Sequence, residues 1–246
     1  MNNPRLIIDI ETGADYLAVS EFIPRFPAFD PASVAVGNIK DPEKIKLKVD
    51  LAEQKHARDT QQHVDDFRDR AALDAWTGEV VAVGLKLPSG EDRIIGGDEG
   101  EILENTWAYL GTWMEKFHDI VGFNIKGFDL PFLVRRSWKN KVPVPVNLLS
   151  KDRYFHPSFV DLRDKWAVGE YRPKGSLDLI CRHFGLKGKA EDFGGADFAE
   201  AYRSGDEERI KRAREYLRED LRMTAEVADI VIGPVTKITK EDNIFA

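Results

Sequence analysis

The sequence predicts an α/β domain in which a mixed central sheet is flanked by helices. Short apolar segments typical of strands alternate along the chain with longer segments whose apolar residues recur at helical spacing. The 246 residues suit one large domain with a substantial core, and no repeat or low-complexity linker divides them. We therefore expect a single domain over residues 1–246, with an insertion after the first strand.

The expected elements follow one another in an order that favours a mixed sheet. The clearest strands are the apolar runs at residues 6–10 and 79–87. Amphipathic spacing predicts helices at residues 102–117 and 207–231. The other expected elements are strands at residues 93–95, 120–124 and 159–162, and helices at residues 129–138 and 176–184.

Residues 14–74 are predicted to form the insertion. Its first part, residues 14–38, contains three prolines, and we expect it to be irregular. Residues 41–74 are highly charged, with apolar residues such as Val64 and Phe67 at helical spacing. The polarity indicates a solvated helical excursion rather than a part of the core.

The net charge is −7 at pH 7. This argues against sequence-independent duplex binding, which usually requires a basic surface. It does not exclude a nuclease, because a site built from carboxylates carries its own negative charge, which bound cations offset.

Cys181 is the only cysteine, which excludes an intrachain disulfide or a thiolate zinc site and favours a reducing compartment. No apolar run approaches the roughly 20 residues that a membrane-spanning helix needs. The chain begins with acids directly behind a short apolar run, which is unlike a signal peptide. We therefore expect a cytoplasmic protein that does not associate with membranes.

The pattern D-x-E is the first candidate for a chemical site. It occurs at residues 9–11, 41–43 and 206–208, and only the first copy lies in an apolar strand. Strand side chains alternate, so Asp9 and Glu11 project from the same face, as a shared cation requires. The alternative is an ordinary strand end whose acids face water.

The second candidate is the segment GFNIKGFD. It puts Asn124 at the end of a short strand and Asp129 at the start of the next helix. Aspartate is a favoured N-cap and Pro131 suits the first helical turn, so Asp129 could be only a cap. Capping and metal ligation are compatible, because a carboxylate has about four lone-pair sites.

The third candidate lies in the last helix. Its apolar stripe consists of Ala213, Tyr216, Leu217, Met223, Thr224, Val227, Ile230 and Val231. Asp220 lies within this stripe, and none of its neighbours at helical spacing can neutralise it. An unpaired carboxylate on a buried face is costly, so we expect a cation, a donor network or a raised pKa. Tyr216 lies one turn earlier and points its hydroxyl group into the same space.

Taken together, these segments resemble the DEDD exonuclease superfamily, which has a ribonuclease-H-like fold. The superfamily pattern is D-x-E, then N-x(2,3)-[FY]-D, then Y-x(3)-D or H-x(4)-D on a late helix. The matching residues are Asp9 and Glu11, Asn124 with Phe128 and Asp129, and Tyr216 with Asp220. The tyrosine version, DEDDy, resembles most the proofreading domain of family B DNA polymerases and its stand-alone relatives. The resemblance covers about residues 5–12 and 77–232.

Two other pairs fit the third motif by spacing. His156 and Asp161 fit the histidine version, but Pro157 and the strand-like residues 159–162 keep them off one helical face. Tyr202 and Asp206 fit the tyrosine version, but a Ser-Gly pair between them breaks the helix. We therefore favour the pair in the last helix and retain Asp161 and Asp178 as candidate supporting acids.

The resemblance implies a metal-dependent exonuclease that removes nucleotides from the 3′ end of DNA, most simply single-stranded DNA. It implies two divalent cations, Mg²⁺ or Mn²⁺, held by Asp9, Glu11, Asp129 and Asp220, with Asp9 shared between them. The oxygen donors agree with such ions. Tyr216 is implied to orient the attacking water, because its ordinary pKa near 10 makes it a poor base at neutral pH.

The resemblance also implies residues that hold the terminal nucleotide. These are Thr12, Asn124 and Phe128, the last by stacking on a base, although core packing explains Phe128 equally well. Basic residues that could line the path of the strand are Lys126, Arg135, Arg136, Arg172 and Lys174, and each is also explained as a solvated surface charge.

Three alternatives remain at this stage. The same four acids can cleave RNA, so a 3′-end trimming ribonuclease is the main rival, and recognition of the 2′-OH would separate the two. A catalytically silent nucleic-acid-binding module is disfavoured by the presence of all four acids. An ordinary metabolic enzyme is disfavoured because neither G-x-G-x-x-G nor a P-loop sequence occurs. Protein partners in replication or repair are not identified by the sequence.

Overall fold

The computed structural model describes residues 4–150, 154–171, 173–189 and 193–233. Backbone contacts divide the chain into two compact units. Unit 1 comprises Met1–Gly13 and Glu79–Ala246, and unit 2 comprises Ala14–Gly78. All residues of the three sequence motifs therefore belong to unit 1.

Unit 1 is built on a five-stranded sheet with the order β3-β2-β1-β4-β7. Its strands are β1 (Arg5–Ala14), β2 (Gly78–Lys86), β3 (Asp92–Gly96), β4 (Asp119–Gly122) and β7 (Phe159–Asp161). β1 pairs with β4 and β4 with β7 in parallel, whereas β2 and β3 form an antiparallel pair. The predicted α/β class with a mixed central sheet is confirmed, and β1 is the central strand.

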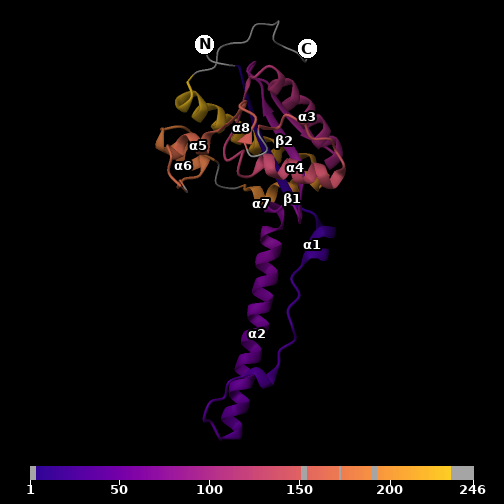
Figure 1. Ribbon diagram of the computed structural model, residues 1–246, viewed down its shortest axis with the longest axis vertical. Helices are drawn as coiled ribbons and strands as arrows, with labels where there is room; N and C mark the ends of the chain where they lie inside the picture. Colours follow the sequence, from indigo (N-terminus) through magenta and orange to yellow (C-terminus); the bar gives the residue numbers. More distant parts are fainter. Residues whose placement is uncertain (1–3, 151–153, 172, 190–192, 234–246) are drawn as a thin grey trace. The chain divides into compact units, whose positions relative to one another are not determined.

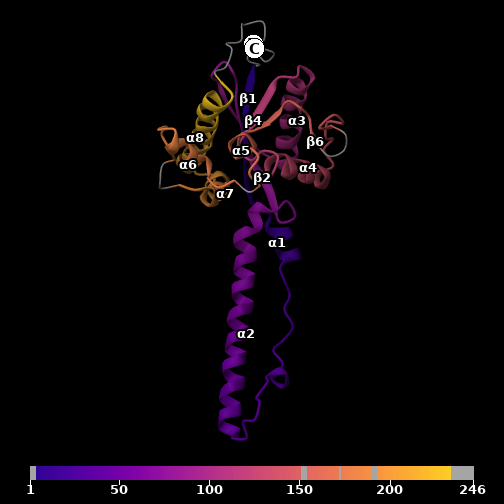
Figure 2. The same cartoon turned by 60° about the vertical axis from the view of Figure 1, so that its left-hand side comes forward.

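Helices cover both faces of this sheet. α3 (Glu99–Glu115) and α4 (Asp129–Asn140) pack against each other on one side (Figure 1). α8 (Glu207–Val231) lies on the other side, in contact with α5 (Leu162–Ala167), α6 (Leu177–His183) and α7 (Gly195–Arg203). The sheet separates the α3–α4 pair from α6 and α8 in both views (Figure 2).

The packing of α8 on the sheet places its inward-facing side chains against β1 and β2. Leu217 of α8 packs with Val81 of β2 in one buried cluster, and Leu221 packs with Ile7 of β1 in another. At Gly84 a Cβ atom would lie 2.9 Å from Leu217 Cγ. A glycine at this position therefore allows α8 to approach β2 closely. Ile230, expected in the buried stripe, is instead 50% exposed near the end of the helix.

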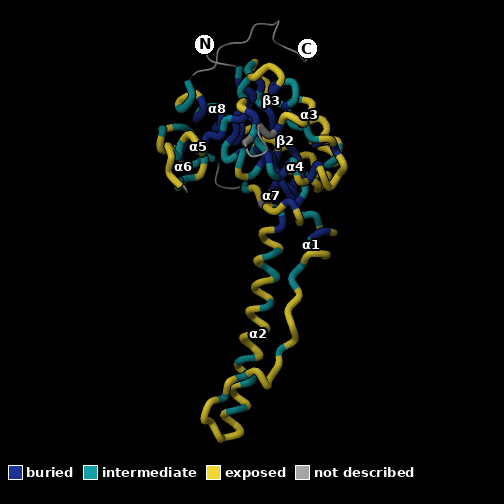
Figure 3. The backbone as a smooth tube through the Cα atoms, viewed as in Figure 1, coloured by how far each residue is buried: buried dark blue, intermediate teal, exposed yellow. Residues whose placement is uncertain are grey.

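Unit 2 contains α1 (Tyr16–Phe22), a 3₁₀ turn at Pro31–Ser33, α2 (Pro42–Arg70) and a second 3₁₀ turn at Ala71–Leu73. α2 confirms the predicted solvated helix, because none of its residues is buried (Figure 3). The segment between α1 and α2 packs on α2 through ring contacts of Phe26 with His63 and of Phe29 with His56. Across the described ranges, no helix combines the length and apolar character needed to cross a membrane.

Several short elements differ from the prediction. The stretch expected to be irregular contains α1, which begins where the Asp15 side chain accepts a hydrogen bond from the Ala18 N–H. α5 has only six residues, too few for a helical period to show, and α7 begins at a glycine pair typical of a loop. The two-residue strands β5 (Leu149–Ser150) and β6 (Tyr154–Phe155) were also not predicted.

Candidate active site

Asp9 and Glu11 project from β1 toward the layer that contains α8. Alternation along the strand gives them the same face as Ile7, which packs in a buried cluster with Leu221 and Met223 of α8. In the pairing of β1 with β4, Ile7 lies opposite Val121, and β1 then continues past the end of β4. The two carboxylates thus lie at the carboxyl end of a parallel strand pair, where ligands commonly bind in α/β sheets.

α8 brings Asp220 to these two acids. One carboxylate oxygen each from Asp9, Glu11 and Asp220 lies within 4.8 Å of the other two. Asp220 is 5% exposed, and its Oδ1 atom has no hydrogen-bond partner among the described residues. Buried polar atoms are normally paired, so this oxygen is suited to a ligand. A cluster of hard oxygen donors of this kind can bind a metal ion.

Asp129 is the first residue of α4 and is 4% exposed. The preceding N-cap is Phe128, so Asp129 is not the cap that its position in the sequence allowed. Its carboxylate accepts hydrogen bonds from its own backbone N–H and from that of Ile10 in β1. Asp129 lies outside the 4.8 Å cluster, but its charge raises the pKa of both Asp9 and Glu11.

The four carboxylates share a strongly unfavourable electrostatic environment. Burial raises the pKa of Glu11 to about 8, and the charge of Asp220 adds to this effect. Burial raises the pKa of Asp129 to about 7 against the opposing effect of its backbone hydrogen bonds. Burial also raises the pKa of Asp9, and repulsion from the other three carboxylates raises it further. Burial raises the pKa of Asp220 as well. A bound cation would offset these charges and favour the ionised forms.

Lys189 contacts this cluster from the loop between α6 and α7. Its Nζ donates hydrogen bonds to Asp220 Oδ2 over 2.8 Å and to Tyr216 Oη over 2.7 Å. Burial lowers the pKa of Lys189, but the charge of Asp220 and these two hydrogen bonds outweigh that effect and leave the pKa above its ordinary value. Lys189 is not predicted by the sequence pattern, because a lysine in a glycine-containing loop belongs to no strand or helix pattern.

Tyr216 lies beside Asp220 on α8, as the helical spacing predicts. Its ring contacts those of Phe193 and Phe198 at centroid distances of 5.4 and 6.4 Å. Burial and the charge of Asp220 raise the pKa of Tyr216 to about 12, so the phenol is neutral at pH 7. The hydroxyl oxygen accepts from Lys189, which leaves its own proton available to a further acceptor.

The three residues expected to hold a nucleotide occupy different surroundings. Asn124 is half-buried and has a left-handed backbone with φ of 62°, and its Oδ1 atom lies 2.5 Å from where a Cβ atom at Gly127 would be. The ring of Phe128 is half-buried and contacts Phe132 at 5.4 Å. Thr12 is buried, on the opposite face of β1 from Glu11 by strand alternation. Their roles in substrate binding stay predictions.

The two candidate supporting acids each hold a loop beside the site. Asp161 accepts backbone hydrogen bonds from Asn124 and Lys126, in the turn that leads to α4. Asp178 Oδ1 accepts from the backbone N–H of Lys189 at 2.8 Å. These contacts were not predictable from spacing, because each joins residues that are distant in the sequence.

The rival third motifs do not share a helix. His156 follows β6, whereas Asp161 ends β7 and caps α5. Tyr202 belongs to α7 and Asp206 caps α8, with Gly205 at φ of 70° between them. Among the three pairs considered, only Tyr216 and Asp220 lie on one helix.

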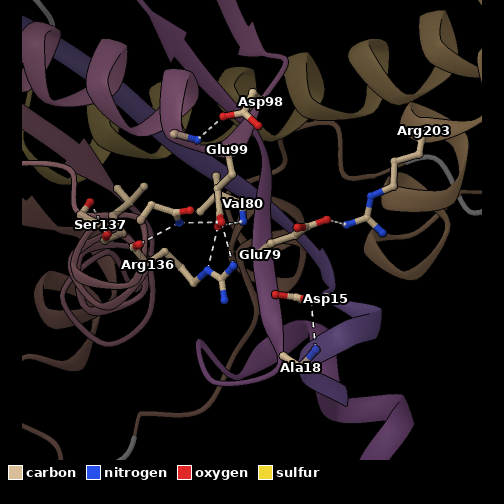
Figure 4. Close-up of polar contacts among 12 residues, drawn as sticks. Asp15, Ala18, Glu79, Val80, Asp98, Glu99, Arg136, Ser137 and Arg203 are labelled. Carbon is tan, nitrogen blue, oxygen red and sulfur yellow. Dashed lines mark hydrogen bonds and ion pairs between the residues drawn. The ribbon is translucent and has the colours of Figure 1, made fainter. Parts of the chain in front are cut away.

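Both sequence-based interpretations of Arg136, as a residue along the path of the strand and as a solvated surface charge, are wrong. Its side chain is 2% exposed, and its Nε and Nη2 donate to the carboxylate of Glu99 at 2.8 and 2.7 Å (Figure 4). The same carboxylate accepts from the Val80 N–H of β2. Arg136 therefore ties α4 to α3 and the sheet. Arg135 and Lys174 are exposed and Lys126 is half-buried, while Arg172 lies outside the described residues.

Comparison with known proteins decides the family. Residues 88–224, more than half of the chain, match the model of a family described as predicted 3′–5′ exonucleases related to the exonuclease domain of PolB. The chain belongs to this exonuclease family. The matched segment contains Asn124, Asp129, Tyr216 and Asp220, and the predicted resemblance is confirmed.

Two individual proteins are similar to this chain. An uncharacterized protein of Methanocaldococcus jannaschii is 32% identical over 168 residues, which cover 65% of this chain and 89% of the relative. The family B DNA polymerase of Pyrobaculum calidifontis matches in structure with a TM-score of 0.59 and 17% identity over 94% of this chain. The match spans 25% of that polymerase, so it establishes a shared fold with a part of it.

Proposed function

We propose that this chain is a 3′→5′ exonuclease that removes nucleotides from the 3′ end of single-stranded DNA. Water adds to the terminal phosphodiester, a P–O bond to the water oxygen forms, and the P–O3′ bond breaks. The leaving 3′ oxygen takes a proton, and the products are a nucleoside 5′-monophosphate and a strand shortened by one nucleotide. Membership of the exonuclease family supports a nucleic-acid substrate.

One observation carries the proposal. Oxygens of Asp9, Glu11 and Asp220 converge within 4.8 Å, and Oδ1 of Asp220 is buried without a partner among the described residues. A pair of acids on the first strand and a third acid from the last described helix would not be held together in a buried site for stability alone, because they repel one another. Such a cluster is suited to a phosphoryl-transfer site that holds cations.

The donor set fits two divalent cations, Mg²⁺ or Mn²⁺. Asp9, Glu11, Asp129 and Asp220 would hold them through carboxylate oxygens, and no thiolate or imidazole group is needed. When bound, such ions supply Lewis-acid stabilisation of the charge that develops on the phosphoryl group. The raised pKa values of Glu11 and Asp129 imply that their ionised forms depend on nearby positive charge.

The remaining residues orient the reactants. Tyr216 is neutral at pH 7, and its hydroxyl group donates a hydrogen bond to the attacking water, which orients the water without any transfer of a proton. Lys189 fixes that hydroxyl group through its hydrogen bond and adds positive charge beside Asp220. Asn124 and Phe128 hold the terminal nucleotide at the turn before Asp129, together with Thr12, which follows Glu11 in β1.

The test uses single-stranded DNA and RNA of the same sequence, each labelled at the 5′ end, with Mg²⁺, Mn²⁺ or EDTA. We expect a ladder of products shortened from the 3′ end of DNA that requires metal and is lost in Asp220→Ala. Glu215→Ala is the matched control, because Glu215 is an exposed acid on the same helix and should retain activity.

The same assay decides between the alternatives. Faster shortening of RNA than of DNA would replace the proposed substrate by RNA while retaining the chemistry. Binding of either strand without shortening would favour a silent nucleic-acid-binding module. Activity that persists in EDTA or in Asp220→Ala would contradict the proposed site.

A further inference from the structure

Asp161 lies at the end of β7, next to the end of β4, and is 3% exposed. Both of its carboxylate oxygens are used. Oδ1 accepts from the backbone N–H groups of Asn124 and Arg163, each at 2.9 Å, and Oδ2 accepts from the Lys126 N–H at 3.0 Å. This buried carboxylate thus accepts three hydrogen bonds from backbone N–H groups. Hydrogen bonds to an ionised acceptor are stronger than those between neutral groups.

Two of these bonds fix the turn that leads to Asp129. The turn starts at Asn124, whose φ of 62° lies in the sparsely populated left-handed region. The carbonyl of Asn124 accepts from the N–H groups of Gly127 and Phe128, and α4 begins at the next residue. The path of the turn therefore sets where the side chains of Asn124, Phe128 and Asp129 lie.

The hydrogen bonds of Asp161 serve two roles, capping α5 and holding the turn before α4. The bond to Arg163 is an ordinary N-cap of α5, and it uses Oδ1. The bond from Lys126 uses Oδ2, joins residues 35 positions apart and contributes nothing to α5. Capping alone would be satisfied by a serine, so it does not account for the second oxygen or for the bond to Asn124.

We propose that Asp161 is a positioning residue of the exonuclease site, holding the turn at residues 124–128 so that Asp129 lies beside the carboxylate cluster. This inference rests on the proposed function. Asp161 acts through the backbone of the turn and does not itself contact the reacting atoms. When a residue that orients metal ligands without binding the metal is replaced, metal affinity or activity typically falls by about 10–100-fold.

The decisive variant is Asp161→Ser, which retains an oxygen that can cap α5 but cannot span to both N–H groups of the turn. Asp161→Asn retains the size of the side chain and one acceptor oxygen. The matched control is Asp164→Asn, because Asp164 is an exposed acid in α5, the helix that Asp161 caps, and pairs with the Lys126 side chain at 3.4 Å. All variants are made in the full chain and measured well below their unfolding temperatures.

Three measurements are made on each variant: kcat and KM on single-stranded DNA, Mn²⁺ affinity by calorimetry, and backbone amide hydrogen exchange. We expect Asp161→Ser to lower kcat and Mn²⁺ affinity by about 10–100-fold and to speed exchange at Asn124 and Lys126. Asp161→Asn should give intermediate values, and Asp164→Asn should match the wild type in all three measurements.

Wild-type kcat, Mn²⁺ affinity and amide protection in Asp161→Ser would overturn the proposal and leave Asp161 as a helix cap. If Asp161→Ser does not fold, Asp161→Asn decides, because wild-type values for that variant contradict the proposal equally. If the wild-type protein cleaves no nucleic acid, the proposed function fails. The Mn²⁺ affinity and the amide exchange then still test whether Asp161 holds the turn and the cluster.

Discussion

Glu11 is 7% exposed, and its carboxylate lies beside those of Asp9 and Asp220. Its pKa is raised from an ordinary value of 4.5 to about 8, first by burial and then by the charge of Asp220. A group whose pKa is raised on folding contributes stability that is complete below its unfolded value and is lost as the pH rises through its folded value. For Glu11 this interval runs from about pH 4.5 to pH 8.

We therefore expect Glu11→Gln to stabilise the metal-free protein at high pH. The neutral amide removes one buried charge, so at pH 9 in EDTA the free energy of unfolding should rise by about 1 kcal/mol or more, and Tm by roughly 2–4 °C per kcal/mol. Below pH 4.5 the difference should disappear, because the carboxyl is protonated in both states. Thermal unfolding by circular dichroism checks this, and equal Tm values at pH 9 would contradict it.

Tyr216 is proposed to act through its hydroxyl group, so Tyr216→Phe separates orientation from binding. The ring contacts with Phe193 and Phe198 are retained, whereas the acceptor for Lys189 and the donor to water are lost. We expect kcat to fall by about 10-fold or more with little change in KM, as for a group that acts in the transition state. Single-turnover kinetics measure this, and a change confined to KM would assign Tyr216 to substrate binding instead.

At the scale of elements, the pair of Arg136 and Glu99 joins α4, which carries Asp129, to α3. The Arg136 side chain is 2% exposed and that of Glu99 is 11% exposed. Arg136→Met should destabilise the protein by about 3–5 kcal/mol, because it leaves a buried carboxylate without its partner. Adding Glu99→Gln should recover part of this loss. Urea unfolding measures both, and a double variant no more stable than Arg136→Met would contradict the account.

The elements that position the site were predictable because each is long or strongly patterned. β1 is a continuous apolar run, and α8 shows helical spacing over 25 residues, so the faces of Asp9, Glu11 and Asp220 followed from alternation and periodicity. α5 and α7 were missed because they have six and nine residues, and α7 starts at Gly194 and Gly195. Their positions depend on packing against α8 rather than on local sequence.

The contacts around the acids were harder to predict than the acids. An unpaired Asp220 in an apolar stripe indicates that a cation, a donor or a raised pKa must be present, but it does not identify Lys189. Likewise, nothing in the sequence near Asp161 indicates its bonds to Asn124 and Lys126. Each contact joins a loop to a helix or strand that is distant in the sequence, so both follow from topology and not from spacing.

At the scale of the whole molecule, the four acids come from the first part, the middle and the last part of the chain. Asp9 and Glu11 lie in the first strand and Asp220 in the last described helix, and parallel pairing with β4 places Asp129 beside them. Unit 2 is inserted three residues after Glu11, yet it contributes none of the four carboxylates. The family match at residues 88–224 likewise contains no part of unit 2. The proposed chemistry is therefore a property of unit 1.

The most direct test of this account is a calorimetric titration of the metal-free protein with Mn²⁺ at pH 8. The account predicts binding to the wild type and to Glu215→Gln, with affinity at least about 10-fold weaker in Asp220→Asn, which removes a charged ligand but retains the shape of the side chain. No binding to the wild type, or equal affinity in Asp220→Asn, would contradict the claim that β1 and α8 together form a cation site.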